Sequence, residues 1–267
     1  MEIYQGIILG ILQGLTEFLP VSSSGHLVLG QIYFGITECG LVFDASVHMG
    51  TLGAVFIVYF KDIQEILKSL VHYAGTRDVR GHETNLALAA AIIIGSVPTA
   101  IIGLVLKQFE EILFTSSLLV GAMLIVTGSF LWVSRHYYRV EEGEPLTPSK
   151  AVIIGIVQGL AVIPGISRSG ATIATGLFTG LDRKTAARFS FLLSIPAILG
   201  AQVISVKDMI ESQGHIDPAT ICGTIASFIV GLAALKLLLK LVNTGKFHLF
   251  APYCWLAGIL ALSSNFL

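Results

Sequence analysis

The sequence predicts an all-α integral membrane protein with six transmembrane helices and two re-entrant helical hairpins, arranged as an inverted repeat. Two observations support this prediction. Hydrophobic residues make up 54% of the chain and charged residues only 12%, with a mean hydropathy of +0.82, a composition typical of a protein embedded in lipid. In addition, one unusual segment occurs twice, which indicates two copies of one structural unit.

The repeated segment is an apolar stretch that ends in a proline and a serine–glycine cluster. It reads GILQGLTEFLPVSSSG at residues 10–25 and returns as GIVQGLAVIPGISRSG at residues 155–170. The step is 145 residues from Gln13 to Gln158, and the same from Gly25 to Gly170. We therefore expect a single membrane domain over residues 1–267, built from inverted repeats at about 1–135 and 150–267.

Six stretches approach the ~20 apolar residues that a helix needs to cross a bilayer: 42–60, 86–107, 113–133, 187–206, 219–241 and 249–266. Residues 2–36 and 150–181 differ, because Pro, Gly and Ser interrupt each of them at its middle. Their halves are too short to cross alone, and irregular backbone at membrane depth is tolerated only where protein or water surrounds it. Each is therefore predicted to form a re-entrant hairpin.

Glycines recur at four-residue spacing in the first half of each predicted hairpin. Gly6, Gly10 and Gly14 form one series, and Gly155 and Gly159 form the other. Small residues at this spacing lie on one helix face and let a neighbouring helix approach closely. We expect both hairpins to be tightly packed within the helical bundle.

The distribution of Lys and Arg predicts the orientation in the membrane. Most of these residues fall in loops on one side, and the loops of the other side carry only Lys107 and Lys207. The positive-inside rule makes the basic side cytoplasmic, so both termini lie outside. Each repeat contributes an odd number of crossings, so the second copy is inverted relative to the first. The hairpin tips can then meet near the midplane, as in inverted-repeat transporters.

Each hairpin tip resembles a helix start rich in serine and glycine. Such a start offers unpaired backbone N–H groups and the positive end of a helix dipole, both of which attract anions. Close packing is the alternative explanation for the serines alone. Arg168 favours function, because arginine is costly at membrane depth and its planar donors fit phosphate oxygens. The candidate anion-binding residues are Ser22, Ser24, Gly25, Ser167, Arg168, Ser169 and Gly170.

Glu17 is the second costly residue in this region. It follows Gln13 by four residues, so both side chains lie on one helix face near the first tip. A carboxylate and an amide oxygen there suit a hard divalent cation whose other ligands come from phosphate and water. A structural ion pair between Glu17 and Arg168 is the alternative, although such a pair alone adds little stability. The two interpretations are compatible.

His26 follows Ser22 by four residues and Ser23 by three, so a helix would bring it within reach of either hydroxyl. A histidine in this position can act as a general base or a nucleophile, whereas packing is the alternative for a lone membrane histidine. Asp44 and His48, also four residues apart, begin the first full crossing. We expect these two residues to contact the site residues from behind and hold them in place.

At these residues the chain resembles the undecaprenyl pyrophosphate phosphatase family, often called the bacitracin-resistance proteins, over essentially its whole length. The family motif Glu/Gln-x-x-x-Glu, followed by Pro-Val-Ser-Ser-x-Gly-His, stands at residues 13–26. The motif Pro-Gly-x-Ser-Arg-Ser-x-x-Thr stands at residues 164–172. Gln13 takes the glutamine option, and Ser24 occupies a place where relatives can carry threonine.

The resemblance implies a Mg²⁺- or Ca²⁺-dependent phosphatase of the bacterial inner membrane, with an active site that opens to the periplasmic face. It would hydrolyse undecaprenyl pyrophosphate to undecaprenyl phosphate and inorganic phosphate, which recycles the lipid carrier for peptidoglycan and cell-wall synthesis. The implied partners are the polyprenyl pyrophosphate lipid and the bilayer. A net charge of −1 argues against nucleic acid. A homodimer is compatible with this arrangement.

Family roles carried over to this chain make Glu17, Ser23, His26 and Arg168 catalytic. Glu17 and Gln13 would hold the metal, and the residues that grip the pyrophosphate extend to Thr172. Three routes of attack stay open: Ser23 attacks with His26 as base, His26 attacks directly, or His26 activates water. The rival function is a polyprenyl-phosphate flippase or an anion transporter on the same scaffold. An enzyme is favoured, because only the first repeat carries Glu17 and His26.

Overall fold

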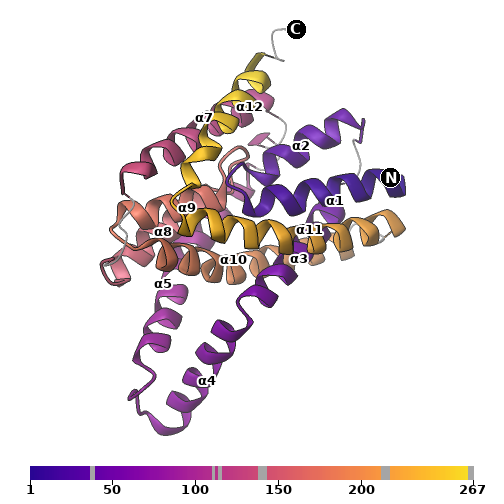
Figure 1. Cartoon of the computed structure of the whole chain (residues 1–267). Helices are drawn as coiled ribbons and strands as arrows, with labels where there is room; N and C mark the ends of the chain where they lie inside the picture. Colours follow the sequence, from indigo (N-terminus) through magenta and orange to yellow (C-terminus); the bar gives the residue numbers. More distant parts are fainter. Residues whose placement is uncertain (37–39, 110–111, 114–115, 138–142, 212–216, 264–267) are drawn as a thin grey trace.

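The computed structural model shows an all-helical chain, in which residues 1–36, 40–109, 112–113, 116–137, 143–211 and 217–263 are described (Figure 1). No strand occurs among these residues. The helices, in chain order, are α1 Ile3–Phe18, α2 Ser23–Tyr33, α3 Gly40–Val58, α4 Phe60–Thr76, α5 Glu83–Lys107, α7 Ser117–Ser134, η1 Arg135–Tyr137, α8 Pro148–Leu160, α9 Arg168–Phe178, α10 Arg183–Glu211, α11 Pro218–Asn243, η2 Phe247–Phe250 and α12 Ala251–Ser263.

The repeated segments each form two helices joined by a short irregular loop. The first loop, residues 19–22, joins α1 to α2, and the second loop, residues 161–167, joins α8 to α9. Each contains a proline, Pro20 or Pro164, which cannot donate a helical hydrogen bond. Because α1 has 16 residues and α8 has 13, both are shorter than the ~20 residues of a crossing.

Four described helical stretches are long and apolar enough to cross a membrane: Glu83–Lys107, Ser117–Tyr137, Arg183–Lys207 and Pro218–Asn243. They correspond to four of the six predicted crossings. The crossing predicted at 42–60 ends in a bend of 74° between α3 and α4, and this bent pair counts as a fifth span if taken as one. The crossing predicted at 249–266 is not confirmed, because its described part is the shorter apolar stretch Phe247–Ser263.

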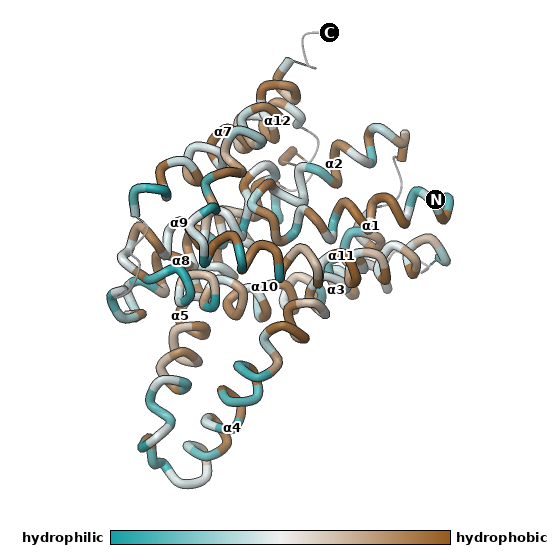
Figure 2. Tube along the Cα trace, viewed as in Figure 1, coloured by the Kyte–Doolittle hydropathy of each residue, from teal (hydrophilic) through white to brown (hydrophobic). Residues whose placement is uncertain are grey.

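Polar residues concentrate where the chain leaves the apolar bundle. In Figure 2 they are most evident along α4, in the turn that leads from α4 to α5, and near the start of α8, whereas the long helices are mostly apolar. Just after the bend that follows α3, Arg188 of α10 donates from Nε to the Asp62 carboxylate of α4 at 2.6 Å. The apolar stretch of α3 therefore ends at a polar, ion-paired junction.

The first helix of each repeated segment packs against a long helix from the other half of the chain. α1 lies along α11, and α8 lies along α5 (Figure 1). Glycine makes both approaches feasible, because a side chain on Gly10 would collide with the Gly223 carbonyl and one on Gly155 with the Gly95 carbonyl. The close packing predicted from the glycine spacing is confirmed. Each loop therefore follows a helix whose glycine face packs against the opposite half of the chain.

Candidate functional site

The two loops meet in the interior of the molecule. The Gly165 N–H of the second loop donates to Ser22 Oγ of the first at 3.0 Å. The Ser169 hydroxyl, in the first turn of α9, donates to the Phe18 carbonyl at the end of α1, at 2.8 Å. These bonds join the matching segments of the two repeats directly. The meeting of the tips that the repeat predicts is therefore present.

Serine caps the helix that leaves each loop. Ser22 Oγ accepts from the Gly25 N–H at the start of α2, and Ser167 Oγ accepts from the Gly170 N–H at the start of α9. Ser22 and Ser167 are equivalent positions of the repeat. Each cap satisfies one of the first-turn N–H groups and leaves the positive end of the helix dipole at the loop. Two helix N-termini are thus brought together, as an anion site requires.

Ser22 adopts a strained backbone conformation, with φ of +68°. Positive φ is uncommon for a residue with a side chain, and it persists where surrounding bonds hold it. Here the Ser22 hydroxyl accepts N–H groups from both Gly25 and Gly165. The strain therefore lies at the point where the two loops are joined.

Glu17 is the centre of the polar network, and its side chain is only 5% exposed. Oε1 forms an ion pair with Nη2 of Arg168 from the second repeat. Oε2 accepts the Ser23 hydroxyl at 2.6 Å and the Gln13 amide at 3.0 Å. The ion pair that the sequence left as an alternative is present, and it shares one carboxylate with a serine hydroxyl.

His48 of α3 also approaches this carboxylate, in addition to Ser23 of α2 and Arg168 of α9. Its Nε2 lies 3.7 Å from Glu17 Oε2. Nδ1 of His48 bonds to the Asp44 carbonyl at 2.7 Å, and since a carbonyl only accepts, Nδ1 carries the proton. The Asp44 carboxylate accepts from the Gln31 amide at 2.7 Å. Of the two residues expected to support the site from behind, His48 instead faces the Glu17 carboxylate directly.

His26 makes different contacts from those expected. Its Nδ1 bonds to the Ser22 carbonyl at 2.8 Å, and its Nε2 bonds to the Tyr253 hydroxyl of α12 at 2.6 Å. The two rings are stacked, with centroids 5.7 Å apart. In the described part of the chain no bond joins His26 to a serine hydroxyl, because the first turn of α2 turns Nδ1 back to the Ser22 carbonyl. The Ser23 hydroxyl instead bonds to Glu17.

Buried hydroxyls hold the second loop in place, and one of them, Thr172, was expected to bind substrate. The Thr172 side chain is fully buried and donates to the Arg168 carbonyl at 2.7 Å, with a further contact to the Ser190 hydroxyl of α10. Thr127 of α7 donates to the Gly165 carbonyl at 2.8 Å and accepts the Ser167 N–H at 3.1 Å. These contacts fix the start of α9, and with it the position of Arg168.

Three of these contributors were not identified from the sequence: Thr127, Ser190 and Tyr253. All three lie on helices outside the repeated segment and reach the loops only through tertiary packing. A hydroxyl within an apolar stretch is the one local signal that they carry, and it is weak, because many such hydroxyls bond to their own helix.

Among the described residues, no group of three or more His, Cys, Asp or Glu side chains could hold a metal ion. The groups near the tip that could bind a metal are the Glu17 carboxylate and the Gln13 amide, whose buried Oε1 has no hydrogen-bond partner among the described residues. An unpaired buried oxygen beside a carboxylate fits a hard cation that takes its remaining ligands from phosphate and water.

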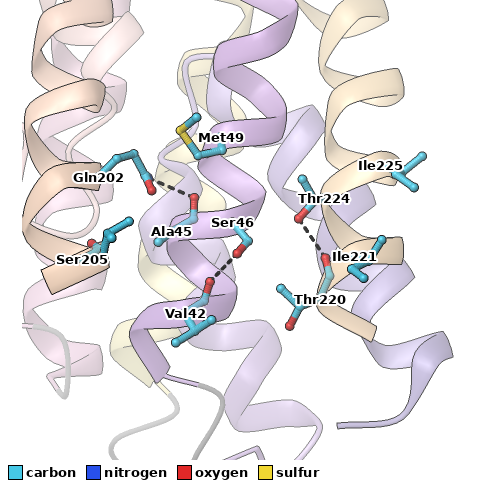
Figure 3. Close-up of a pocket in the computed structure, with 11 residues that line it drawn as sticks. Val42, Ala45, Ser46, Met49, Gln202, Ser205, Thr220, Ile221, Thr224 and Ile225 are labelled. Carbon is cyan, nitrogen blue, oxygen red and sulfur yellow. Dashed lines mark hydrogen bonds between the residues drawn. The ribbon is translucent and has the colours of Figure 1, made fainter. Parts of the chain in front are cut away.

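Two pockets adjoin the helices of the bundle. One has a volume of about 460 Å³ and reaches the site through His26; its lining is Leu12, Leu15, Thr16, Leu19, Val21, His26, Phe250 and Tyr253. The other, of about 350 Å³, lies between α3, α10 and α11 (Figure 3). The hydroxyls of Ser46 and Thr224 in this second pocket donate to carbonyls of their own helices. Since no charged side chain lines it, it is unsuited to a diphosphate.

Known proteins resemble this chain over its full length. The family model for Bacitracin resistance protein BacA matches residues 6–260. An undecaprenyl-diphosphatase of Desulforapulum autotrophicum is 54% identical, over 100% of this chain and 99% of that protein. Proteins of the same name from Desulfosudis oleivorans and Methanosphaera stadtmanae are 54% and 43% identical, each over 98% of both chains.

Proposed function

This chain belongs to the bacitracin resistance protein family, and we propose that it hydrolyses undecaprenyl diphosphate where its two loops meet. It is a multi-pass membrane phosphatase that acts on a polyprenyl diphosphate and releases undecaprenyl phosphate and inorganic phosphate. The main support for placing the active site at the loops is the Glu17 carboxylate. It contacts both Arg168 of the second repeated segment and Ser23 of the first.

The diphosphate binds between the two capped helix starts. Arg168 supplies a guanidinium, and the first turns of α2 and α9 supply positive dipole ends. In the structure, Arg168 is paired with Glu17. A phosphate oxygen competes with the carboxylate for this arginine, so substrate binding releases Glu17 from its strongest partner. Phosphoryl transfer depends mainly on such positioning and charge neutralisation.

Ser23 is the attacking group that the geometry favours among the open routes. Its Oγ attacks the terminal phosphorus while its proton passes to Glu17 Oε2, which lies 2.6 Å from that oxygen. The bond between the terminal phosphorus and the bridging oxygen breaks, and undecaprenyl phosphate leaves. Water then hydrolyses the phosphoserine. In this scheme His26 positions the first turn of α2 through the Ser22 carbonyl.

A divalent cation, Mg²⁺ or Ca²⁺, fits beside this carboxylate. The Glu17 carboxylate and the unpaired Gln13 oxygen would hold it, together with phosphate oxygens and water. When bound, the cation neutralises charge on the diphosphate. The remaining predicted contacts, from Ser24, Ser169 and Thr172, act through the loops, because each of these hydroxyls already contacts another protein oxygen.

The wider architecture extends the same proposal. Six crossings and two re-entrant hairpins form inverted repeats at about 1–135 and 150–267, with both termini outside and the site open to the periplasmic face of the inner membrane. The packing supports this arrangement, because α1 of the first half contacts α11 of the second, and α8 of the second half contacts α5 of the first. The product re-enters the carrier cycle of peptidoglycan synthesis. A homodimer stays a prediction.

Phosphate release in detergent micelles tests the enzymatic function, because a micelle has no second compartment. The purified protein should release phosphate from undecaprenyl diphosphate when Mg²⁺ or Ca²⁺ is supplied. The opposite result would be transport of polyprenyl phosphate across vesicle membranes with no phosphate release in micelles with either cation. That result would identify the protein as the flippase or anion transporter that the sequence left as the rival function.

A further inference from the structure

We propose that the pocket between α1 and α12 holds the first isoprene units of the substrate's polyprenyl chain. This inference rests on the proposed function, because it assumes that the diphosphate lies at the two loops. The pocket has a volume of about 460 Å³, and its lining is apolar apart from Thr16, His26 and Tyr253. A polyprenyl diphosphate is apolar up to its head group, so an apolar cavity that adjoins the head-group site suits its first units.

α1 presents different chemistry on two neighbouring faces. Leu12, Leu15 and Thr16 of α1, with Leu19 just past its end, recur at the spacing of one helical stripe, and all four line the pocket. Thr16 donates its hydroxyl to the Leu12 carbonyl at 2.7 Å, so its polar atom is already bonded within the helix. The stripe is about 10 Å long, enough for the first isoprene units of a long chain.

The adjoining face of α1 carries the polar site. Glu17 follows Thr16 directly, and an α-helix turns by about 100° per residue. The same turns of α1 therefore carry the apolar stripe on one face and, on the next face, the Glu17 carboxylate that contacts Arg168. A lipid whose head lies at Glu17 therefore has an apolar surface next to its first carbons.

His26 and Tyr253 form the boundary between the pocket and the polar site. Both residues line the pocket, and the Tyr253 hydroxyl donates a hydrogen bond to His26 Nε2 at 2.6 Å. Nδ1 of the same imidazole is bonded to the Ser22 carbonyl in the first loop. Leu19 and Val21 of this loop also line the pocket, so the pocket adjoins the loop that leads into Ser23. The pocket of Figure 3 lacks such a link, since none of its lining residues belongs to either loop.

The repeat supplies a matched pair of substitutions for the test. Leu15 lines the pocket and is 41% exposed, whereas its repeat counterpart Leu160 is 42% exposed and lies outside the pocket. Leu15→Trp should lower kcat/KM for farnesyl diphosphate by about tenfold or more, because the indole occupies space that the chain needs. Hydrolysis of methyl diphosphate, which has no chain, should be unchanged, and Leu160→Trp should affect neither substrate.

Equal kcat/KM ratios of the two substrates in Leu15→Trp and in the wild-type protein would overturn the inference. The proposed function fails differently, since wild-type protein would then release no phosphate from undecaprenyl diphosphate. A second measurement needs no variant: a farnesyl diphosphate with a diazirine on its first isoprene unit is photolysed with wild-type protein. Labels on Leu12, Leu15 or Phe250 that undecaprenyl diphosphate suppresses support the inference. Labels on Met49 or Gln202, or labels that phospholipid suppresses equally, contradict it.

Discussion

Removal of the Arg168 charge should destabilise the protein, and the cost can be worked from the structure. The Glu17 side chain is 5% exposed and that of Arg168 is 20% exposed, so an Arg168→Met variant leaves a buried carboxylate without its cation. Loss of one partner of a buried pair costs about 3–5 kcal/mol. Ser23 and Gln13 still donate to the carboxylate, so we expect the lower end, about 3 kcal/mol.

Thermal unfolding in a fixed detergent measures this cost. A loss of about 3 kcal/mol corresponds to a fall in Tm of roughly 6–12 °C for a chain of this size. The double variant Glu17→Gln/Arg168→Met should recover most of the loss, because neither charge is then buried alone. If Arg168→Met unfolded at the wild-type temperature, or if the effects of the two substitutions were simply additive, Glu17 and Arg168 would not act as one coupled pair.

Three further predictions follow from named contacts. Ser23→Ala should lower kcat by about a thousandfold and abolish any phosphoenzyme trapped by rapid quenching, and a trapped phosphohistidine would contradict this assignment. Gly10→Ala should cost about 1–3 kcal/mol in thermal unfolding because the new methyl meets the Gly223 carbonyl, whereas Gly200→Ala, with open space around it, should be neutral or stabilising. Gln13→Ala should raise the Mg²⁺ concentration needed for half-maximal activity, while its repeat counterpart Gln158→Ala should leave that concentration unchanged; equal effects would remove Gln13 from the metal site.

Much of the fold follows from the sequence because its signals are strong and local. Long apolar stretches predict the helices α5, α7, α10 and α11, and the paired prolines predict both loops. The duplicated segment also predicts that the loops meet, since two matching frames with different reactive groups suggest one composite site. The glycine spacing then explains how one face of α1 packs against α11 and one face of α8 against α5.

The sequence was less informative where tertiary packing decides the outcome. The bend after Val58 was not predicted, and the ion pair beside it joins Asp62 and Arg188, which are far apart in the sequence. His26 was expected to bond to a serine hydroxyl, but Tyr253 of another helix takes its Nε2. Helical spacing gives the face on which a side chain lies, but it does not tell which partner from a distant segment occupies that face.

The location of the site is tested most directly by the rate at which purified Arg168→Ala protein releases phosphate from undecaprenyl diphosphate. Arg168 lies on the second repeat and pairs with Glu17 of the first, so it belongs to the site only if the two loops form one pocket. Wild-type protein should release phosphate, and Arg168→Ala should show almost none while it still unfolds cooperatively. Near-normal release by a folded Arg168→Ala variant would contradict a shared site.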